Sequence, residues 1–470
     1  MDLISIVSGL LPYVKYSIFI FIALIMGFFI FKKVFQGKYP IRLSKFILIL
    51  LLICWGTVVL GITTLSRPAM FIGQFNPSLF SSYVNAWNKW SMPELQLIIF
   101  NMFMFVPLGF LLPLIHPKMK SFWRVFILSI VFTLCVEIFQ YISGKGIFEL
   151  DDLLHNTIGS LAGYFIVMAI VTSIEKRKLK LAPIVRSLAI PLSFVFLFGI
   201  ANAVYSAQEY GNLPFKPAQK QNMEQIDVKL ETQLSNEPSN ACIYYNSNVR
   251  DINNLKNISQ SIAQQFDLQQ QGGIRMEGEN RQLQLIDEEE HTYYLTYFMS
   301  NGSWSFSSDI YSEETPRVDI QQQKQSMEEW LEDEDLFPIN ATYQQQDERT
   351  IRWDLEEPKN AQSTCEDFSQ GFIIVNLSDK QTPDGITYEV SNNKMVKEKV
   401  IISPQEAYEA LLSGEFSLYN SLQKGDTLTV TEVRLDYTYD TKGYYQPVYV
   451  FTGAVNAPDL TVEILIPAIK

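Results

Sequence analysis

Residues 95–109 read LQLIIFNMFMFVPLG, an apolar run that contains Asn101 and Pro107. With its continuation to Ile115, the run has the length of about 20 residues that a helix needs to cross the hydrocarbon core of a bilayer. Five further runs approach or reach that length: Leu11–Phe31, Phe46–Leu65, Phe122–Ile142, Leu153–Ile174 and Ile184–Tyr205. The sequence therefore predicts an all-α membrane bundle of six transmembrane helices over residues 1–205.

Charge divides the chain of 470 residues into two parts. Residues 1–204 contain 17 Lys and Arg against 7 Asp and Glu, whereas residues 205–470 contain 20 against 43. Net charges of +10 and −23 in one chain indicate two domains in different surroundings and exclude a single soluble core. Nucleic-acid binding is not expected, because the basic residues lie between apolar runs and the polar part is acidic.

The basic residues of the loops predict the orientation of the bundle. Lys and Arg are concentrated in the first, third and fifth connections, and the second and fourth carry fewer. Because cytoplasmic loops are enriched in Lys and Arg, the odd connections are predicted to be cytoplasmic. Both termini, and everything after about residue 205, are then extracytoplasmic. The residues behind this prediction are Lys32, Lys33, Lys38, Arg42 and Lys45, then Lys118, Lys120 and Arg124, then Lys176, Arg177, Lys178, Lys180 and Arg186.

Polar residues recur at one depth in three consecutive spans. At about 1.5 Å per residue, Asn101 and Glu137 lie roughly 10 Å and 8 Å from the outer ends of their helices. Gln140 follows Glu137 by one turn. Asp152, His155 and Asn156 share a face at the outer start of the fifth span. This topology places all six side chains in the outer leaflet, with Lys145 in the connection between the fourth and fifth spans.

A carboxylate within a span costs roughly 3 kcal/mol on insertion scales, so Glu137 is expected to face a partner or a wet cavity. Two interpretations remain open. The amides and acids are either hydrogen-bonding contacts between helices, or they line a ligand-binding or reactive pocket. Pro107, Gly109, Gly159 and Gly163 are assigned to packing or bending, since glycines allow close helix approach and proline frees a carbonyl.

Aromatic residues dominate the external second connection, residues 66–94. They are either anchors at the level of the lipid headgroups or a lid over the polar pocket. The six aromatic residues concerned are Phe71, Phe75, Phe80, Tyr83, Trp87 and Trp90.

Three motifs, in this order and spacing, resemble the VanZ-like domain of Gram-positive membrane proteins: NMFMFVPLGF at 101–110, EIFQ at 137–140 and DDLLHNTIG at 151–159, with Gly163 and Tyr164 beyond. The resemblance covers about residues 46–174. It implies a cell-envelope setting and an association with resistance to teicoplanin-type lipoglycopeptide antibiotics, without an agreed reaction. The family usually has Arg before the acidic motif, where this chain has Lys145, which keeps the charge but loses the bidentate fork.

The C-terminal part is predicted to be an extracytoplasmic α+β domain with an antiparallel sheet over residues 241–470, joined by a linker over 206–240. Ile252, Leu255, Ile258, Ile262 and Phe266 have helical spacing. Ser326 with Glu329, and Ser403 with Glu406, are predicted capping boxes. Strands are expected over Leu428–Tyr439, Val448–Phe451 and Leu460–Ile466, with a bulge near Thr431–Glu432, where the alternation changes phase. Cys242 and Cys365 both lie in this domain, where a disulfide can persist, but sequence does not decide whether they are bridged.

Two functional classes follow. The first is a non-catalytic membrane protein that binds an amphiphile or a lipid-linked envelope ligand, while the C-terminal domain senses or recruits an envelope partner. The second is an intramembrane enzyme acting on a lipid-linked envelope precursor, with Glu137, Asp152 and His155 as candidate catalytic residues. The sequence offers no recognisable nucleophile or metal-ligand spacing. It therefore favours the first class and predicts neither a metal nor a cofactor. Membrane lipids are the expected surroundings, and a lipid-linked precursor or a lipoglycopeptide is the expected kind of ligand.

Overall fold

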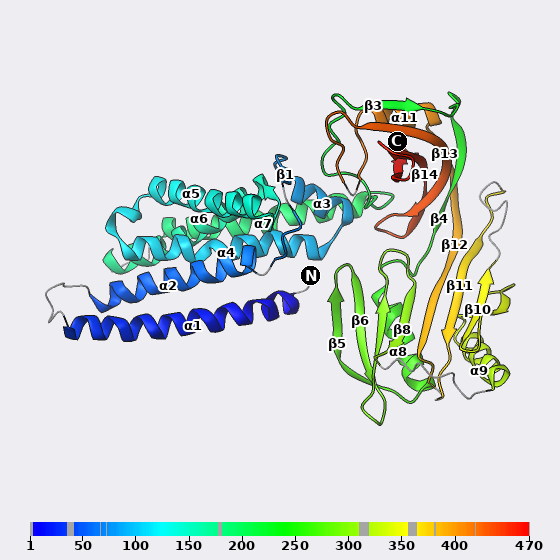
Figure 1. Cartoon of the computed structure of the whole chain (residues 1–470), viewed down its shortest axis with the longest axis horizontal. Coiled ribbons are helices and arrows are strands. Elements are labelled where there is room, and N and C mark those ends of the chain that lie inside the picture. Colours follow the sequence, from blue (N-terminus) through cyan, green and yellow to red (C-terminus); the bar gives the residue numbers. More distant parts are fainter. Residues whose placement is uncertain are drawn as a thin grey trace. The chain divides into compact units, whose positions relative to one another are not determined.

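The computed structural model describes residues 3–34, 42–65, 67–71, 73–176, 181–309, 319–355, 364–379, 382–418 and 420–469 (Figure 1). Two compact units are present. Unit 1 consists of Met1–Ala86 and Met92–Gln208, and unit 2 of Trp87–Ser91 and Glu209–Lys470. Lys38, Arg177, Lys178 and Lys180, which entered the orientation argument, lie outside the described residues.

Unit 1 is mainly helical, and six helices among its described residues are long and apolar enough to cross a membrane. This confirms the six predicted spans, each of which overlaps one of these helices. Apolar side chains such as Phe103, Trp123 and Ile142 remain exposed on the outer faces, as expected where lipid is the solvent. The helices are α1 (Leu3–Val34), α2 (Leu43–Leu60, continued by the π-turn Gly61–Leu65), α4 (Met92–Ile115), α5 (Phe122–Ser143), α6 (Leu150–Lys176) and α7 (Leu181–Ala207).

Glycines bring α4 and α6 into backbone contact. A Cβ atom built on Gly109 would lie 1.7 Å from the carbonyl oxygen of Ser160. On α6, a Cβ on Gly159 would lie 1.9 Å from the oxygen of Met102, and one on Gly163 would lie 2.0 Å from that of Val106. No side chain fits at such distances, so these three glycines set the separation of the two helices. Pro107 lies inside α4 between these contacts.

Unit 2 is mainly antiparallel sheet, with helices packed against it, as predicted. The 17-residue strand β12 (Gly385–Ile401) is shared by two lobes. Residues 385–393 pair with β11, and the first four of them also pair with β8; residues 394–401 pair with β4. One lobe contains β5 (Gln269–Glu277), β6 (Asn280–Ile286), β7 (Thr292–Tyr297), β8 (Trp304–Ser308), β9 (Thr342–Gln345), β10 (Thr350–Leu355) and β11 (Phe368–Asn376); the other contains β3 (Asp227–Leu230), β4 (Ser239–Tyr245), β13 (Thr427–Tyr439), β14 (Tyr444–Val455) and β15 (Thr461–Pro467).

Each lobe has its own hydrophobic core. Leu255, Ile258 and Ile262 of α8 (Ile252–Gln265) and Trp330 of α9 (Ile320–Asp333) are buried against the first lobe. The second lobe is covered by α11 (Pro404–Leu412), which begins with the predicted capping box of Ser403 and Glu406. The bulge in β13 lies between Val430 and Glu432, as predicted.

Two details of unit 2 differ from the sequence interpretation. The pair Ser326 and Glu329 lies inside α9, whose N-cap is Asp319, so it does not start a helix. Residues assigned to a linker over 206–240 are partly built into the sheet. Strand β3 pairs in parallel with β13, and Met223, Ile226, Val228 and Leu234 pack against the second core. These apolar residues are scattered among polar ones, so the sequence showed no periodic pattern that would predict their burial.

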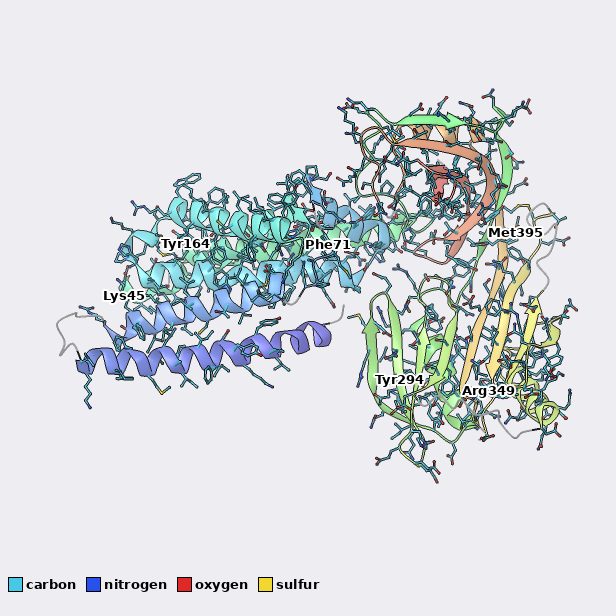
Figure 2. The ribbon with its side chains drawn as sticks, in the orientation of Figure 1. Lys45, Phe71, Tyr164, Tyr294, Arg349 and Met395 are labelled. Atoms are coloured by element: carbon cyan, nitrogen blue, oxygen red, sulfur yellow. A yellow bond between two sulfur atoms is a disulfide. The ribbon has the colours of Figure 1, made fainter. Side chains whose placement is uncertain are left out.

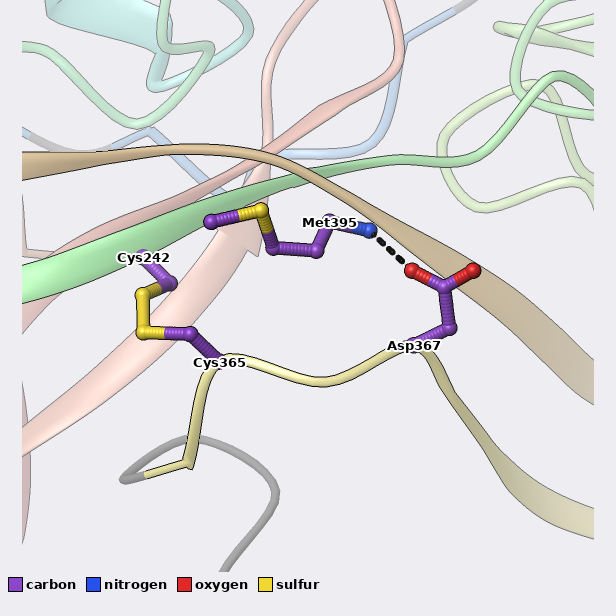
Figure 3. The surroundings of a disulfide bond; sticks show 4 residues. All are labelled: Cys242, Cys365, Asp367 and Met395. Carbon is purple, nitrogen blue, oxygen red and sulfur yellow. Dashed lines mark hydrogen bonds between the residues drawn. A yellow bond between two sulfur atoms is a disulfide. The ribbon is translucent and has the colours of Figure 1, made fainter.

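Cys242 and Cys365 form a disulfide with a Cα–Cα distance of 5.7 Å (Figure 3). It links β4 to the segment that precedes β11 and closes a loop of 123 residues. Asp367, two residues beyond Cys365, accepts a hydrogen bond of 2.7 Å from the backbone N–H of Met395 in β12. The bridge and this hydrogen bond together fasten the segment to the shared strand.

Candidate functional site: a polar cavity at one end of the helical unit

A cavity of about 280 Å³ lies at one end of unit 1. Figure 2 labels Phe71, which lines the cavity, towards one end of the helices and Lys45 near the other. The C-terminal ends of α2 and α5 and the N-terminal ends of α4 and α6 surround it. The lining residues are Thr63, Arg67, Phe71, Ser82, Asn85, Glu94, Leu97, Ile98, Asn101, Met104, Val136, Glu137, Gln140, Gly146, Ile147, Glu149, Asp152, His155 and Asn156.

Six of the seven residues proposed from sequence for a ligand pocket line this one cavity: Asn101, Glu137, Gln140, Asp152, His155 and Asn156. On α4 the lining positions Glu94, Leu97 and Asn101 follow one helical face. The seventh residue, Lys145, is not among the lining residues. Gly144 ends α5 in the left-handed conformation, and the backbone N–H of Lys145 donates a hydrogen bond to the carbonyl oxygen of Gln140. The cation that lines the cavity is Arg67, which the sequence analysis did not single out.

Hydrogen bonds from neighbouring helices hold the amide side chains in place. Asn101 Nδ2 on α4 donates to Asp152 Oδ1 on α6 at 2.7 Å. Gln140 Nε2 donates to the carbonyl oxygen of Thr63 in the π-turn at 2.8 Å, and this hydrogen bond is buried. Asn156 Nδ2 donates to Thr133 Oγ1 on α5 at 2.8 Å. The amide nitrogens are therefore used within the protein.

Polar atoms of three residues that line the cavity are unpaired. Within the described residues, Gln140 Oε1, Asn156 Oδ1 and both ring nitrogens of His155 have no hydrogen-bond partner. These side chains are only 3%, 4% and 1% exposed. Asp152 Oδ1 lies 3.9 Å from His155 Nδ1, which is too far for a hydrogen bond. Buried polar atoms are normally paired, and these three unpaired groups all belong to residues that line the cavity.

Carboxylates outnumber cations in the lining, with Glu94, Glu137, Glu149 and Asp152 against Arg67. Glu137 is 1% exposed, and its Oε2 accepts a hydrogen bond of 3.3 Å from the backbone N–H of Glu149. Burial, reinforced by the negative charge of Asp152, raises the pKa of Glu149, which lies just before α6.

A short helix, α3 (Ser81–Lys89), contributes Ser82 and Asn85 to the lining. The completely buried carboxylate of Asp151 caps its start. Asp151 accepts hydrogen bonds from the N–H of Phe80 at 2.5 Å, the N–H of Ser82 at 2.7 Å and the hydroxyl of Ser81 at 3.1 Å. The two adjacent acidic residues thus have different roles. Asp151 stabilises the start of α3, and Asp152 faces the cavity.

The segment before α3 is also attached at the cavity. Phe75 and Asn76 form β1, which pairs in parallel with Phe148 and Glu149 of β2, and the rings of Phe75 and Phe148 lie 5.1 Å apart. On α3, the Tyr83 ring meets His155 edge to face with a centroid distance of 5.2 Å. Phe71 therefore lines the cavity, and Tyr83 contacts a histidine that lines it.

In the described part of unit 2, one group of side chains has its potential metal-ligand atoms close together. Ligand atoms of Asp287, Glu289 and His291 lie within 4.8 Å of one another in the β6–β7 turn. His291 Nδ1 is 2.9 Å from Asp287 and 3.4 Å from Glu289. Asp287 Oδ1 also accepts the backbone N–H groups of both other residues, so its carboxylate stabilises the turn.

Residues 18–172 match the family model described as VanZ/LLP1. The helical unit contains a VanZ-like domain. The family is linked to glycopeptide resistance. The search of curated proteins finds no match. Two solved structures are similar to parts of the chain. The "Bacillus megaterium YpeB C-terminal domain" has 13% identity and a TM-score of 0.21, covering 46% of this chain and 92% of its own. An uncharacterized protein from Eubacterium rectale has 9% identity and a TM-score of 0.22, covering 52% and 88%.

The three motifs of the VanZ-like domain divide into lining and packing positions. Asn101, Glu137 and Asn156 face the cavity, whereas Gly109 and Gly159 bring α4 and α6 together. Apolar motif residues fill the space between the helices. Leu108, for example, is buried with Tyr164 in the core of the bundle, and the hydroxyl of Tyr164 donates to the carbonyl of Lys120.

Proposed function

We propose that the VanZ-like domain binds the polar headgroup of an amphiphilic or lipid-linked envelope ligand in its cavity, on the extracytoplasmic side of the membrane. The observation that carries the proposal is the set of buried, unpaired polar groups on Gln140, His155 and Asn156. The hydrogen bonds between helices use only the amide nitrogens of Gln140 and Asn156, and all three residues line a cavity of about 280 Å³.

Two observations support the extracytoplasmic placement. Lys and Arg are concentrated in the odd connections. The Cys242–Cys365 disulfide is of a kind that persists in oxidising compartments, and unit 2 continues the chain from the cavity end of α7. Cysteine labelling in intact cells is expected to find Ser78 and Tyr210 accessible, and positions 37 and 178 protected. Protection of Tyr210 would contradict this orientation.

The binding proposal is tested by native mass spectrometry of the full chain, purified from membranes of the producing cell. The wild type is expected to retain one class of lipid. Asn156→Leu replaces an unpaired amide by an apolar group and is expected to lose it. Asn202→Leu on α7 is the control and is expected to keep it, because the amide oxygen of Asn202 accepts a bond from Ser206 on the same helix and Asn202 does not line the cavity. Equal retention by both variants would contradict the proposal.

The link of the family to glycopeptide resistance suggests a cellular role in tolerance of teicoplanin-type lipoglycopeptides, which are amphiphiles themselves. A susceptible host that expresses the chain is expected to become less sensitive to teicoplanin. Glu137→Gln, at equal protein level, is expected to remove the effect. In this proposal the acidic unit 2 senses or recruits an envelope partner.

An intramembrane enzyme remains the second candidate, because Asp152 and His155 lie 3.9 Å apart and line the same cavity as Glu137. Such a group could move a proton on a bound lipid-linked precursor. Lipidomics of a deletion strain separates the two candidates. Accumulation of one precursor supports the enzyme, and an unchanged lipid composition supports binding alone.

A further inference from the structure

The cavity of the VanZ-like domain combines two chemical features. Residues that line it carry buried, unpaired atoms, namely two amide oxygens, Gln140 Oε1 and Asn156 Oδ1, and the ring nitrogens of His155. The nitrogen atoms of both amides already donate within the protein. Amide oxygens only accept hydrogen bonds, and a neutral imidazole has one acceptor nitrogen. The protein therefore presents unmatched acceptors and lacks donor atoms beyond the second imidazole nitrogen at these positions.

The charges of the lining residues also favour a ligand that is a hydrogen-bond donor and carries positive charge. Four carboxylates line the cavity against one arginine, and Arg67 is exposed whereas Glu137 is buried. A buried carboxylate is costly unless positive charge compensates it, and a bound cation would add to the compensation that the exposed Arg67 gives to Glu137. An anionic group in the same place would add to the repulsion and would leave the two amide oxygens without a donor.

From these two features we infer that the ligand headgroup is a primary amine or another ammonium donor group. The inference rests on the proposed function and specifies its ligand class. An ammonium has three N–H donors, no acceptor and a positive charge, which together match the unpaired acceptors and the acidic lining. A divalent metal fits less well. Within the described part of unit 1, no three carboxylate, His or Cys groups bring ligand atoms within 4.8 Å of one another.

This chemistry can come from an amine-bearing lipid or from a free amine, and the test separates them. Full-length protein in detergent is titrated with dodecylamine, butylamine and dodecyl phosphate, and binding is followed by thermal stabilisation. Dodecylamine is expected to stabilise the wild type, dodecyl phosphate is not, and Glu137→Gln is expected to weaken dodecylamine binding by tenfold or more. Asn202→Leu and Lys145→Arg lie outside the cavity lining and are expected to bind as the wild type does.

The outcomes are distinct. Stabilisation by butylamine as strong as that by dodecylamine assigns the amine to a free solute, and stabilisation by dodecylamine alone assigns it to an amphiphile. If only dodecyl phosphate stabilises the protein, and Asn156→Leu abolishes this, the ammonium inference fails while the binding proposal stands. Equal affinity of Glu137→Gln and wild type for dodecylamine also overturns the inference. If Asn156→Leu changes the response to none of the probes, the binding proposal fails as well.

Discussion

Asp151 and Asp152 are neighbours with different environments. Asp151 is completely buried and accepts three hydrogen bonds at the start of α3, whereas Asp152 is partly exposed to the cavity and accepts one from Asn101. Hydrogen bonds to a charged group contribute roughly 1.5–3 kcal/mol, and a negative charge at a helix N-terminus adds to this. Asp151→Asn is therefore expected to lower the unfolding free energy by about 1–3 kcal/mol.

Thermal denaturation in detergent measures this loss, and Asp152→Asn is the control. That variant is expected to melt closer to the wild type and to show its effect in ligand binding. If Asp152→Asn were the less stable of the two variants, the stabilising role assigned to Asp151 and the ligand-binding role assigned to Asp152 would be contradicted.

Glu149 gives the stability of unit 1 a pH dependence. Burial and the nearby Asp152 raise its pKa above the ordinary value of 4.5, so the folded state binds this proton more tightly than the unfolded state does. The contribution of protonated Glu149 to the free energy of unfolding is therefore complete at low pH, and it is lost as the pH rises from about 4.5 through the raised pKa. Glu149→Gln removes the ionisation. Its melting temperature relative to the wild type is expected to increase between pH 5 and pH 8, and a constant difference would contradict this.

The polar lining was largely predictable, because the position of a residue along a membrane helix gives its depth in the bilayer and the helical period gives the face on which it lies. Asn101, Glu137 and Asn156 each lie on an apolar helix with a known direction, so their meeting followed from sequence. Arg67 and Lys145 were not predictable in this way, since both lie in connections. The left-handed Gly144 decides the path of the chain at Lys145, and no periodicity indicates where a loop side chain lies.

Among the elements, the α4–α6 pair is the most tightly specified. Gly159→Ala and Gly163→Ala each place a Cβ about 2 Å from a carbonyl oxygen of α4, so the helices must separate. Overpacking of this kind costs about 1–3 kcal/mol or more. Both variants are expected to melt lower and to lose ligand retention. Gly199→Ala on α7, where nothing lies within 4 Å, is the matched control and is expected to melt as the wild type does.

The helix α3 shows why one element escaped prediction. Helices are recognised in sequence from a local N-cap and an apolar period. Here the capping carboxylate comes from Asp151, about 70 residues further along the chain. The six long apolar helices and the capping box at Ser403 carry their signals locally, and the structure confirms them.

At the scale of the whole molecule, the boundary of unit 2 is open to test. A fragment of residues 209–470 carries a net charge of −23 and is expected to be soluble, with a cooperative melt. A fragment of 241–470 lacks β3 and the four side chains that pack from residues 223–234. At about 1 kcal/mol for each partly buried side chain, its melting temperature is expected to be roughly 10 °C lower. Equal melts would assign residues 209–240 to a linker.

The central claim is that the cavity of the VanZ-like domain selects a ligand. A photo-reactive amino acid at Leu97, which lines the cavity, tests this most directly against the same group at Ile99. Both positions lie on α4 with similar exposure, 39% and 38%, but Ile99 is not part of the lining. After illumination in native membranes, mass spectrometry is expected to find one lipid class attached at Leu97 and the bulk membrane mixture at Ile99. The same mixture at both positions would contradict the claim.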